Sequence, residues 1–172
     1  GSEMCIRDRY GKAKISQPGG CNIGTRPIDF HLKGLEMMGA KIESDKKFIY
    51  LKAQKLNPID FTFPKVSVTG TENLMMAASL TLGKTILRNC AKEPEVSELA
   101  NFLNSCGAKI SGAGKSIIEI EGTDCLNGKK WKILSDRIEA GTYLIAAAMT
   151  NGHVKVNNIS CLLYTSDAAD EV

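Results

Sequence analysis

Apolar residues recur at helical spacing in two segments of the chain, and the two segments share one design. Each follows a proline, Pro27 or Pro94, and carries an acidic residue in its first turn. The apolar positions are Ile28, Leu32, Leu35 and Met38 in the first segment and Val96, Leu99, Leu103 and Cys106 in the second. Each segment ends at a Gly-Ala-Lys-Ile sequence, residues 39–42 and 107–110. Because glycine favours helix termination, the pattern predicts two helices that each lead directly into a strand.

Short β-prone runs follow both of these strands, at residues 48–51 and 117–120, after polar turns. Each helix is therefore predicted to lead into a β-hairpin. Two further helices are predicted in Ala- and Met-rich segments, because residues 69–72 and 136–139 fit the capping-box pattern of a helix start. We expect these helices to end at Gly83 and Gly152. The strands predicted beside them are Lys65–Val68, Thr85–Asn89 and Val154–Asn158.

The same order of elements recurs along the chain. Gly39 and Gly107, which end the first pair of helices, lie 68 positions apart (107 − 39). The recurring unit is strand, helix, strand, helix, hairpin, which predicts an α/β fold of tandem βαβαββ units with helices packed on mixed sheets. One complete unit is expected from about Val66 to Gly122. The polar segment 124–130 is expected to connect it to the next unit.

Composition narrows the possible functions. The 172 residues include 22 basic and 19 acidic side chains, a net charge of +3 that gives no reason to expect a nucleic-acid partner. The longest apolar runs, Leu74–Leu80 and Tyr143–Met149, are too short to span a bilayer, so no membrane partner is expected. Six cysteines without a Cys-x-x-Cys pair, and two isolated histidines, indicate neither a metal site nor a disulfide framework. We expect a cytoplasmic protein.

A glycine-rich loop, residues 18–27, carries the most suggestive chemistry. Its sequence PGGCNIGTRP places Cys21 among backbone-permissive glycines and five residues before Arg26. Positive charge and a helix start both lower the pKa of a thiol, so one interpretation is a reactive cysteine on a mobile loop. The other interpretation is a tight turn whose cysteine packs inward, since free cysteines are among the most buried residues.

Two helix starts are candidate anion sites. Lys65–Val68 leads into the helix that begins near Thr69, and the unpaired N–H groups of a helix start attract anions. A lysine and a serine in the same turn suit a diphosphate. The second helix start is Arg26–Asp29, where the guanidinium of Arg26 can bind phosphate or carboxylate. The alternative is that the side chains of residues 69–72 cap their own helix and nothing binds there.

Four strings carry a resemblance to a known family: PGGCNIGTRPIDFHLKGLEMMGAKIE, KVSVTGTENLMMAASLTLG, NCAKEPEVSELANFLNSCGAKISG and LSDRIEAGTYLIAAAMTNG. Together they resemble the UDP-N-acetylglucosamine 1-carboxyvinyltransferase family of enolpyruvyl transferases, over roughly residues 14–158. The resemblance implies two domains of three βαβαββ units each, in an inside-out α/β barrel that is incomplete here. It implies that residues 14–122 form the later part of the first, catalytic domain and residues 123–160 the start of a further repeat unit and the second domain. The strings MCIRDR and LLYTSDAADE resemble translated adapter sequence, so residues 1–13 and 161–172 are expected to be non-native flanks.

The resemblance also implies a reaction and a site. Such enzymes transfer the enolpyruvyl group of phosphoenolpyruvate to the 3′-hydroxyl of UDP-N-acetylglucosamine, the first committed step of peptidoglycan synthesis in bacteria, without a metal or organic cofactor. Cys21 falls on the catalytic loop cysteine, the thiol that fosfomycin alkylates. The substrate contacts fall on Arg26, Pro27, Ile28, Asp29 and Phe30, and on Lys65, Val66, Ser67, Val68 and Thr69. Thr69 stands where many members carry glycine.

The family's other catalytic residues have no counterpart in this chain, so we expect it to lack the remainder of its enzyme and to be inactive alone. Two alternatives stay open. One is the shikimate-pathway enolpyruvyl transferase, against which the cysteine of the PGGC sequence argues. The other is a non-catalytic module that binds a nucleotide sugar or phosphate.

Overall fold

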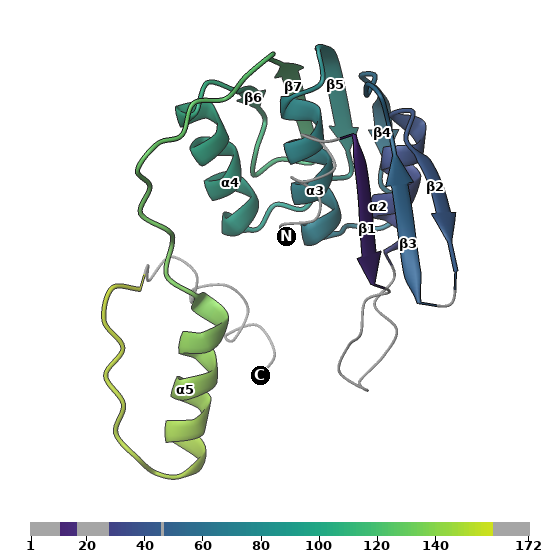
Figure 1. Ribbon diagram of the computed structural model, residues 1–172. Helices are drawn as coiled ribbons and strands as arrows, with labels where there is room; N and C mark the ends of the chain where they lie inside the picture. The colour runs from purple at the N-terminus through teal and green to yellow at the C-terminus, as the bar shows by residue number, and fades with distance from the viewer. Residues whose placement is uncertain (1–10, 17–27, 46, 160–172) are drawn as a thin grey trace. The chain divides into compact units, whose positions relative to one another are not determined.

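The computed structural model describes residues 11–16, 28–45 and 47–159 (Figure 1). The chain divides into two units after Trp131. The helices of the first unit are α2 (Asp29–Met37), α3 (Val68–Ser79) and α4 (Pro94–Ser105). The helix of the second unit is α5 (Arg137–Met149). Helices α2 and α4 lie where the apolar pattern predicts them, and α4 begins at the predicted proline. Helices α3 and α5 lie in the predicted Ala- and Met-rich segments but end at Ser79 and Met149, before the predicted Gly83 and Gly152.

The first unit contains two sheets. One is antiparallel, with strand order β1-β3-β2, and consists of β1 (Lys12–Ser16), β2 (Lys41–Ser44) and β3 (Phe48–Lys52). The other has the order β4-β5-β7-β6 and consists of β4 (Asp60–Thr62), β5 (Gly83–Arg88), β6 (Lys109–Ser111) and β7 (Ile117–Gly122). In it β4 is parallel to β5, while β5 and β6 are antiparallel to β7. The hairpins β2–β3 and β6–β7 confirm the two that were predicted.

The order β4-α3-β5-α4-β6-β7 is the predicted βαβαββ unit, and the mixed sheet confirms the α/β fold class. Among the described strands no sheet closes into a barrel. The first strand of the unit was placed wrongly, however. The segment Lys65–Val68 is not a strand, and the strand lies earlier, at β4. Phe61 and Phe63 bury their rings edge to face, 4.9 Å apart, whereas Val66 is 57% exposed and has no sheet to pack against.

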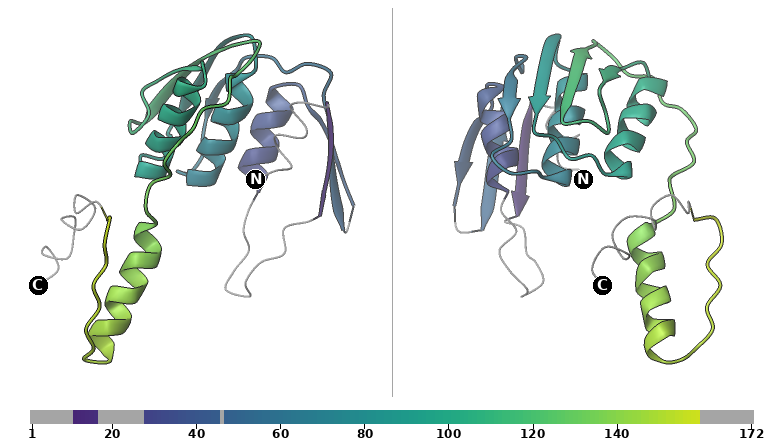
Figure 2. Two further views of the ribbon diagram at one scale, coloured as in Figure 1. Left: turned by 60° about the vertical axis from the view of Figure 1, so that its left-hand side comes forward. Right: turned by 180° about the vertical axis from the view of Figure 1, so that it is seen from behind.

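Helices α2, α3 and α4 lie side by side in the first unit (Figure 2). The core runs between them and the two sheets. Its fully enclosed members include Leu35 in α2 and Met38 directly after it, Leu74 and Met75 in α3, Val96 in α4, and Leu87, Ile118 and Ile120 in the second sheet. Gly34 allows α2 to approach α3 closely, because a Cβ at this position would overlap the side chain of Leu74. One continuous core therefore holds the starts of the three helices in place.

The second unit repeats part of the first. Asp136 caps α5 and Ser67 caps α3, and these residues lie 69 positions apart (136 − 67). At the same offset, the hydroxyl of Thr81 donates to the Ala77 carbonyl and that of Thr150 to the Ala146 carbonyl. Asn89 and Asn158, again 69 apart, both have a positive φ, 56° and 61°. Backbone details of the first unit thus recur in the second at one fixed offset, while the assignment of this unit as the start of another repeat stays a prediction.

The predicted strand Val154–Asn158 is nevertheless absent, which corrects the sequence-based expectation. Its counterpart β5 pairs with β4 on one side and with β7 on the other. A strand needs at least one such neighbour, because its N–H and C=O groups are otherwise satisfied only by water. The described part of the second unit offers no other strand, so the segment stays irregular.

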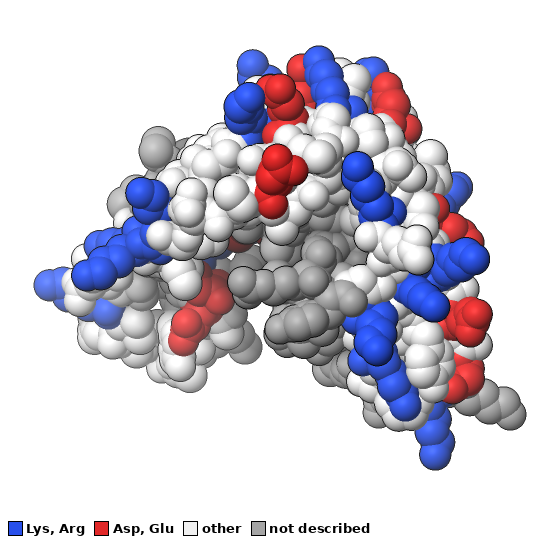
Figure 3. Space-filling model, turned by 45° about the horizontal axis from the view of Figure 1, so that its top comes forward, with Lys and Arg blue, Asp and Glu red and all other residues white. Residues whose placement is uncertain are grey.

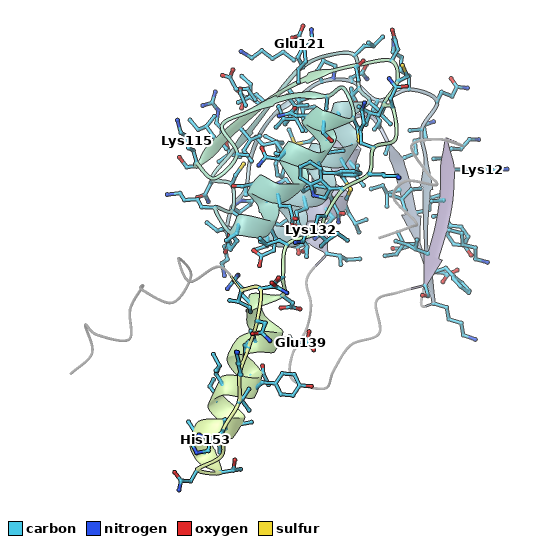
Figure 4. All side chains as sticks on the ribbon, turned by 90° about the vertical axis from the view of Figure 1, so that its left-hand side faces the viewer. Lys12, Lys115, Glu121, Lys132, Glu139 and His153 are labelled. Carbon is cyan, nitrogen blue, oxygen red and sulfur yellow. The ribbon has the colours of Figure 1, made fainter. Side chains whose placement is uncertain are left out.

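Charged side chains of both signs alternate on the surface. On the face shown in Figure 3, basic and acidic residues are interspersed. Ion pairs across neighbouring strands contribute to this pattern: Lys84 with Glu119, 3.0 Å, and Lys109 with Glu121, 3.3 Å. Lys12 and Glu121 point outward from the first unit, and Glu139 lies on α5 of the second (Figure 4).

Candidate functional site

The starts of α2, α3 and α4 lie together in the first unit. His31, in the first turn of α2, contacts Thr69 and Asn73 of α3. Thr71 of α3 accepts a hydrogen bond from the amide of Ala91, three residues before α4. Because every helix start carries unpaired N–H groups and a partial positive charge, these starts are the candidate anion site among the described residues.

Ser67 caps α3. Its backbone is extended, and its hydroxyl oxygen accepts a hydrogen bond from the amide of Gly70 at 3.1 Å. The predicted capping box at residues 69–72 is therefore wrong, since Thr69 already lies inside the helix and its hydroxyl contacts α2 instead. Val68 and Thr69 are the first two helical residues, so their N–H groups have no acceptor within α3.

One buried hydroxyl connects the starts of α3 and α4. Thr71 is fully enclosed, and its Oγ1 donates to the Ser67 carbonyl at 2.7 Å and accepts from the Ala91 amide at 3.2 Å. Cys90 lies beside it, and burial raises the pKa of the Cys90 thiol to about 11 despite hydrogen bonds to Ile118 and Thr71. This cysteine is a packing residue and not a nucleophile at neutral pH.

Three glutamates mark the side of the site between α3 and α4. Burial raises the pKa of Glu72 in α3, and the negative charges of Glu95 and Glu93 raise it further. The carboxyl groups therefore repel one another, although the α4 start offsets part of that repulsion through its dipole. The anion-attracting part of the region is consequently the α2–α3 side, where Lys65 and Thr69 are exposed.

The residues predicted from the sequence fall into three groups. Cys21, Arg26 and Pro27 lie outside the described residues. Ile28 and Phe30 are half-buried and pack against the core at the start of α2, while Asp29 is exposed there. Lys65, Val66 and Thr69 are exposed at the start of α3, and Ser67 and Val68 are half-buried. The contact of His31 with Thr69 brings the two predicted helix starts together.

From the sequence, His31 was noted only as one of two isolated histidines that indicate no metal site, and Asn73 was not predicted as a site residue. A signal was present in the spacing, because Thr69 and Asn73 are four residues apart and so share one face of α3. The hydrogen-bonding partner across the helix interface was not readable from either helix alone.

Other candidate sites are weaker. The described residues contain no group of three His, Cys, Asp or Glu side chains that is arranged to hold a metal ion. None of the described helices is long and apolar enough to cross a membrane.

An open groove lies at the opposite end of β5 from Ala91, beside Lys84, Lys109 and Glu121. Its charged side chains are already used in the ion pairs between strands.

Comparison with known proteins places this geometry in a family. The model of the EPSP synthase (3-phosphoshikimate 1-carboxyvinyltransferase) family matches residues 6–171. A UDP-N-acetylglucosamine 1-carboxyvinyltransferase of Coxiella burnetii (strain Dugway 5J108-111) is 54% identical over 155 residues, which cover 90% of this chain and 36% of that protein. The protein of the same name from Sorangium cellulosum (strain So ce56) is 54% identical over 150 residues, 87% of this chain and 36% of that protein. This chain thus spans about a third of the length of these relatives.

Solved structures show the same fold. The enolpyruvyl transferase NikO from Streptomyces tendae superposes with a TM-score of 0.70 at 20% identity, over 84% of this chain and 35% of that one. EPSP synthase from Acinetobacter baumannii gives a TM-score of 0.61 at 22% identity, over 86% of this chain and 35% of that one. The family model matches nearly the whole length of this chain, and the two relatives are identical to it at about half of the aligned positions. The chain therefore belongs to the EPSP synthase family of carboxyvinyl (enolpyruvyl) transferases.

Proposed function

We propose that this chain is the nucleotide-sugar-binding and cysteine-bearing part of a UDP-N-acetylglucosamine 1-carboxyvinyltransferase. The observation that carries the proposal is the 54% identity, over 90% of the chain, to a protein of that name. The exposed start of α3 beside the start of α2 supports it, because a diphosphate needs donors that are fixed before it binds.

The binding chemistry follows from the residues at these helix starts. The amides of Val68 and Thr69 and the ammonium group of Lys65 suit the diphosphate. The guanidinium of Arg26 would bind the phosphate of phosphoenolpyruvate, and Asp29 would accept hydrogen bonds from hydroxyl groups of the nucleotide. Ile28 and Phe30 anchor this helix start in the core, so that its polar groups keep their positions.

The proposed reaction has two steps. The 3′-hydroxyl oxygen of UDP-N-acetylglucosamine loses its proton to a base and bonds to C2 of phosphoenolpyruvate, while the C2–C3 double bond takes up a proton at C3, which gives a tetrahedral phosphoketal. Inorganic phosphate then leaves from C2 as C3 loses a proton, which gives the enolpyruvyl ether. The thiol of Cys21 would donate the proton to C3, a task that suits a group whose pKa is lowered by positive charge. Neither step requires an external oxidant or reductant.

The biological setting follows from this reaction. The product commits the sugar nucleotide to peptidoglycan, which implies a bacterial cytoplasmic enzyme and a target of fosfomycin at Cys21. The chain by itself would not turn over, because it spans only 36% of the length of its relatives. Its further partner would be the remainder of the enzyme.

The shikimate-pathway enzyme is the second candidate, because the matching family model carries the name of that enzyme. Its acceptor is shikimate 3-phosphate. A chimera distinguishes the two: residues 14–158 replace the aligned segment of the Coxiella burnetii relative, and phosphate release from phosphoenolpyruvate is measured with each acceptor. We expect release with UDP-N-acetylglucosamine only. Release with shikimate 3-phosphate would overturn the proposal, and a correctly folded chimera active with neither acceptor would favour the non-catalytic binding module.

Fosfomycin labelling tests the thiol. The 172-residue chain is incubated with fosfomycin and UDP-N-acetylglucosamine, and the adduct is located by intact mass and peptide mapping. We expect one adduct, on Cys21, that disappears in Cys21→Ser. Cys125→Ser is the matched control, because Cys125 is an exposed free cysteine with no assigned role. An adduct that persists in Cys21→Ser and is lost in Cys125→Ser would contradict the assignment.

A further inference from the structure

Three polar side chains connect the starts of α2 and α3. The side-chain nitrogen of Asn73 contacts Nδ1 of His31, and Oγ1 of Thr69 lies 3.3 Å from Nε2 of the same ring. Asn73 and His31 are half-buried, whereas Thr69 is exposed. These contacts thus connect the half-buried interface between α2 and α3 with the exposed start of α3.

The direction of these hydrogen bonds follows from the imidazole. A neutral histidine has one donor nitrogen and one acceptor nitrogen. Because the Asn73 amide nitrogen can only donate, Nδ1 of His31 accepts and Nε2 carries the hydrogen. Nε2 therefore donates to the hydroxyl oxygen of Thr69. Burial lowers the pKa of His31 and outweighs the opposing charge of Asp29, which favours the neutral ring that this arrangement needs.

The consequence reaches the hydroxyl of Thr69. Since its oxygen accepts from His31, its own hydrogen is available to another acceptor. Thr69 is the second residue of α3, so its hydroxyl belongs to the same helix turn as the amides that have no acceptor within the helix. The hydroxyl and the amides are donors on the same helix start.

We propose that Asn73 and His31 form a relay that holds the Thr69 hydroxyl as a hydrogen-bond donor to the diphosphate of the nucleotide sugar. This inference rests on the proposed function, which supplies the ligand. Thr69 is the binding residue in this scheme, and His31 and Asn73 are positioning residues that act through it.

The first test measures the tautomer of His31 in the full chain without ligand. Long-range ¹H–¹⁵N NMR spectra at neutral pH report which ring nitrogen carries the hydrogen. The sequence has two histidines, so His153→Gln assigns both signals. We expect hydrogen on Nε2 and none on Nδ1 of His31. Hydrogen on Nδ1 would overturn the relay, because Thr69 would then have to donate to Nε2 and its hydrogen would be occupied.

The second test measures ligand affinity. UDP-N-acetylglucosamine is titrated into the full chain and into Thr69→Val, Thr69→Ser and His31→Phe, with amide NMR shifts as the readout. Loss of a hydrogen bond to a charged oxygen is expected to weaken binding roughly tenfold in Thr69→Val and in His31→Phe. The serine variant keeps the hydroxyl and should bind within about twofold of the original chain. A double variant that combines Thr69→Val with His31→Phe should bind no more weakly than Thr69→Val alone, because both changes remove the same interaction.

Controls separate this inference from the proposed function. Thr142→Val removes an exposed helical threonine whose hydroxyl donates within α5, and it should leave affinity unchanged. Inorganic pyrophosphate, titrated in parallel, should lose affinity in Thr69→Val by the same factor as the nucleotide sugar.

Equal binding of UDP-N-acetylglucosamine by Thr69→Val and the original chain would overturn the relay alone. No binding by the original chain would count against both proposals, and loss for the nucleotide sugar but not for pyrophosphate would overturn the assignment to the diphosphate.

Discussion

Thr85 carries a buried hydroxyl for which the described residues provide no hydrogen-bond partner. It lies on β5 opposite Ile120, inside the core. At the repeat offset of 69, the corresponding residue is Val154, which has the same shape without the hydroxyl. An unpartnered buried hydroxyl costs free energy that an apolar group of the same shape does not.

We therefore expect Thr85→Val to raise the free energy of unfolding by about 1 kcal/mol, measured by urea denaturation. The matched control is Thr81→Val, because Thr81 is equally buried but its hydroxyl donates to the Ala77 carbonyl at 2.8 Å. That variant should not gain stability. A loss of stability in Thr85→Val similar to that in Thr81→Val would show that the Thr85 hydroxyl is partnered after all.

Individual residues of the site were predictable to different degrees. Lys65 and Thr69 were placed at an exposed helix start because a helix start can be read from local sequence. The capping residue was misplaced by two positions, since Ser67 and Thr69 are both good caps and only the backbone conformation decides between them. His31 was missed because its partners lie 38 and 42 residues further along the chain.

At the scale of elements, Gly122 fixes how the end of β7 meets the end of α3. A Cβ at this position would overlap the Thr81 carbonyl oxygen, which is backbone and cannot move aside like a flexible side chain. Gly122→Ala is therefore expected to destabilise the protein by about 3 kcal/mol. Gly128→Ala is the control, because a Cβ there would meet nothing within 4 Å.

Thermal denaturation of the two variants checks this expectation. We expect a large fall in the melting temperature for Gly122→Ala and almost none for Gly128→Ala. Similar melting temperatures for both variants would mean that the segment at Thr81 shifts without cost, and that the contact between β7 and α3 is looser than described.

Helices α3 and α5 allow a direct comparison of local sequence with packing. Both have a side-chain cap, Ser67 or Asp136. Seven residues of α3 are buried, whereas Ala140 is the one buried residue of α5, and Tyr143, Ile145 and Met149 expose 57%, 62% and 82% of their surface. Since most helix stability in proteins comes from packing, we expect amide hydrogen exchange in α5 to be at least about 100-fold faster than in α3.

Exchange is measured on the full chain by NMR or by mass spectrometry of peptides. Amides in the middle of each helix give the comparison, because both helix ends fray. Equal protection of α3 and α5 would indicate that α5 is covered in solution, for instance by self-association of its apolar side chains.

Helices and hairpins could be predicted from the sequence because their signals are local. Apolar spacing, a proline at the start and glycine at the end identify α2 and α4 without reference to the rest of the chain. Strands depend on their neighbours. Lys65–Val68 has strand-like alternation but follows Pro64, which lacks an N–H group, and Val154–Asn158 has a suitable sequence but no neighbouring strand among the described residues.

At the scale of the whole molecule, two titrating groups give stability opposite dependences on pH. Burial lowers the pKa of His31 from 6.5, so the unfolded chain binds more protons and stability falls as the pH drops below 6.5. Burial and neighbouring glutamates raise the pKa of Glu72 from 4.5, so the folded chain binds more protons and stability falls as the pH rises above 4.5 through the raised pKa.

We therefore expect His31→Phe to flatten the acid side of a plot of unfolding free energy against pH, and Glu72→Gln to flatten the opposite slope. Both groups are partly exposed, so each effect should stay below about 1 kcal/mol. Urea denaturation at intervals between about pH 4 and pH 8 gives the profile. His153→Gln is the control for the histidine, and a similar flattening in that variant would contradict the assignment to His31.

The double role of the Thr71 hydroxyl limits how the molecule can move. One oxygen atom donates to the residue before α3 and accepts from the segment before α4, and it is shielded from solvent. The bond to the Ser67 carbonyl lies within the start of α3, so a hinge between the two helix starts would have to break the bond from the Ala91 amide, with no water to replace it. One buried hydrogen bond thus joins the two starts, and we expect their spacing to stay the same whether or not an anion is bound beside them.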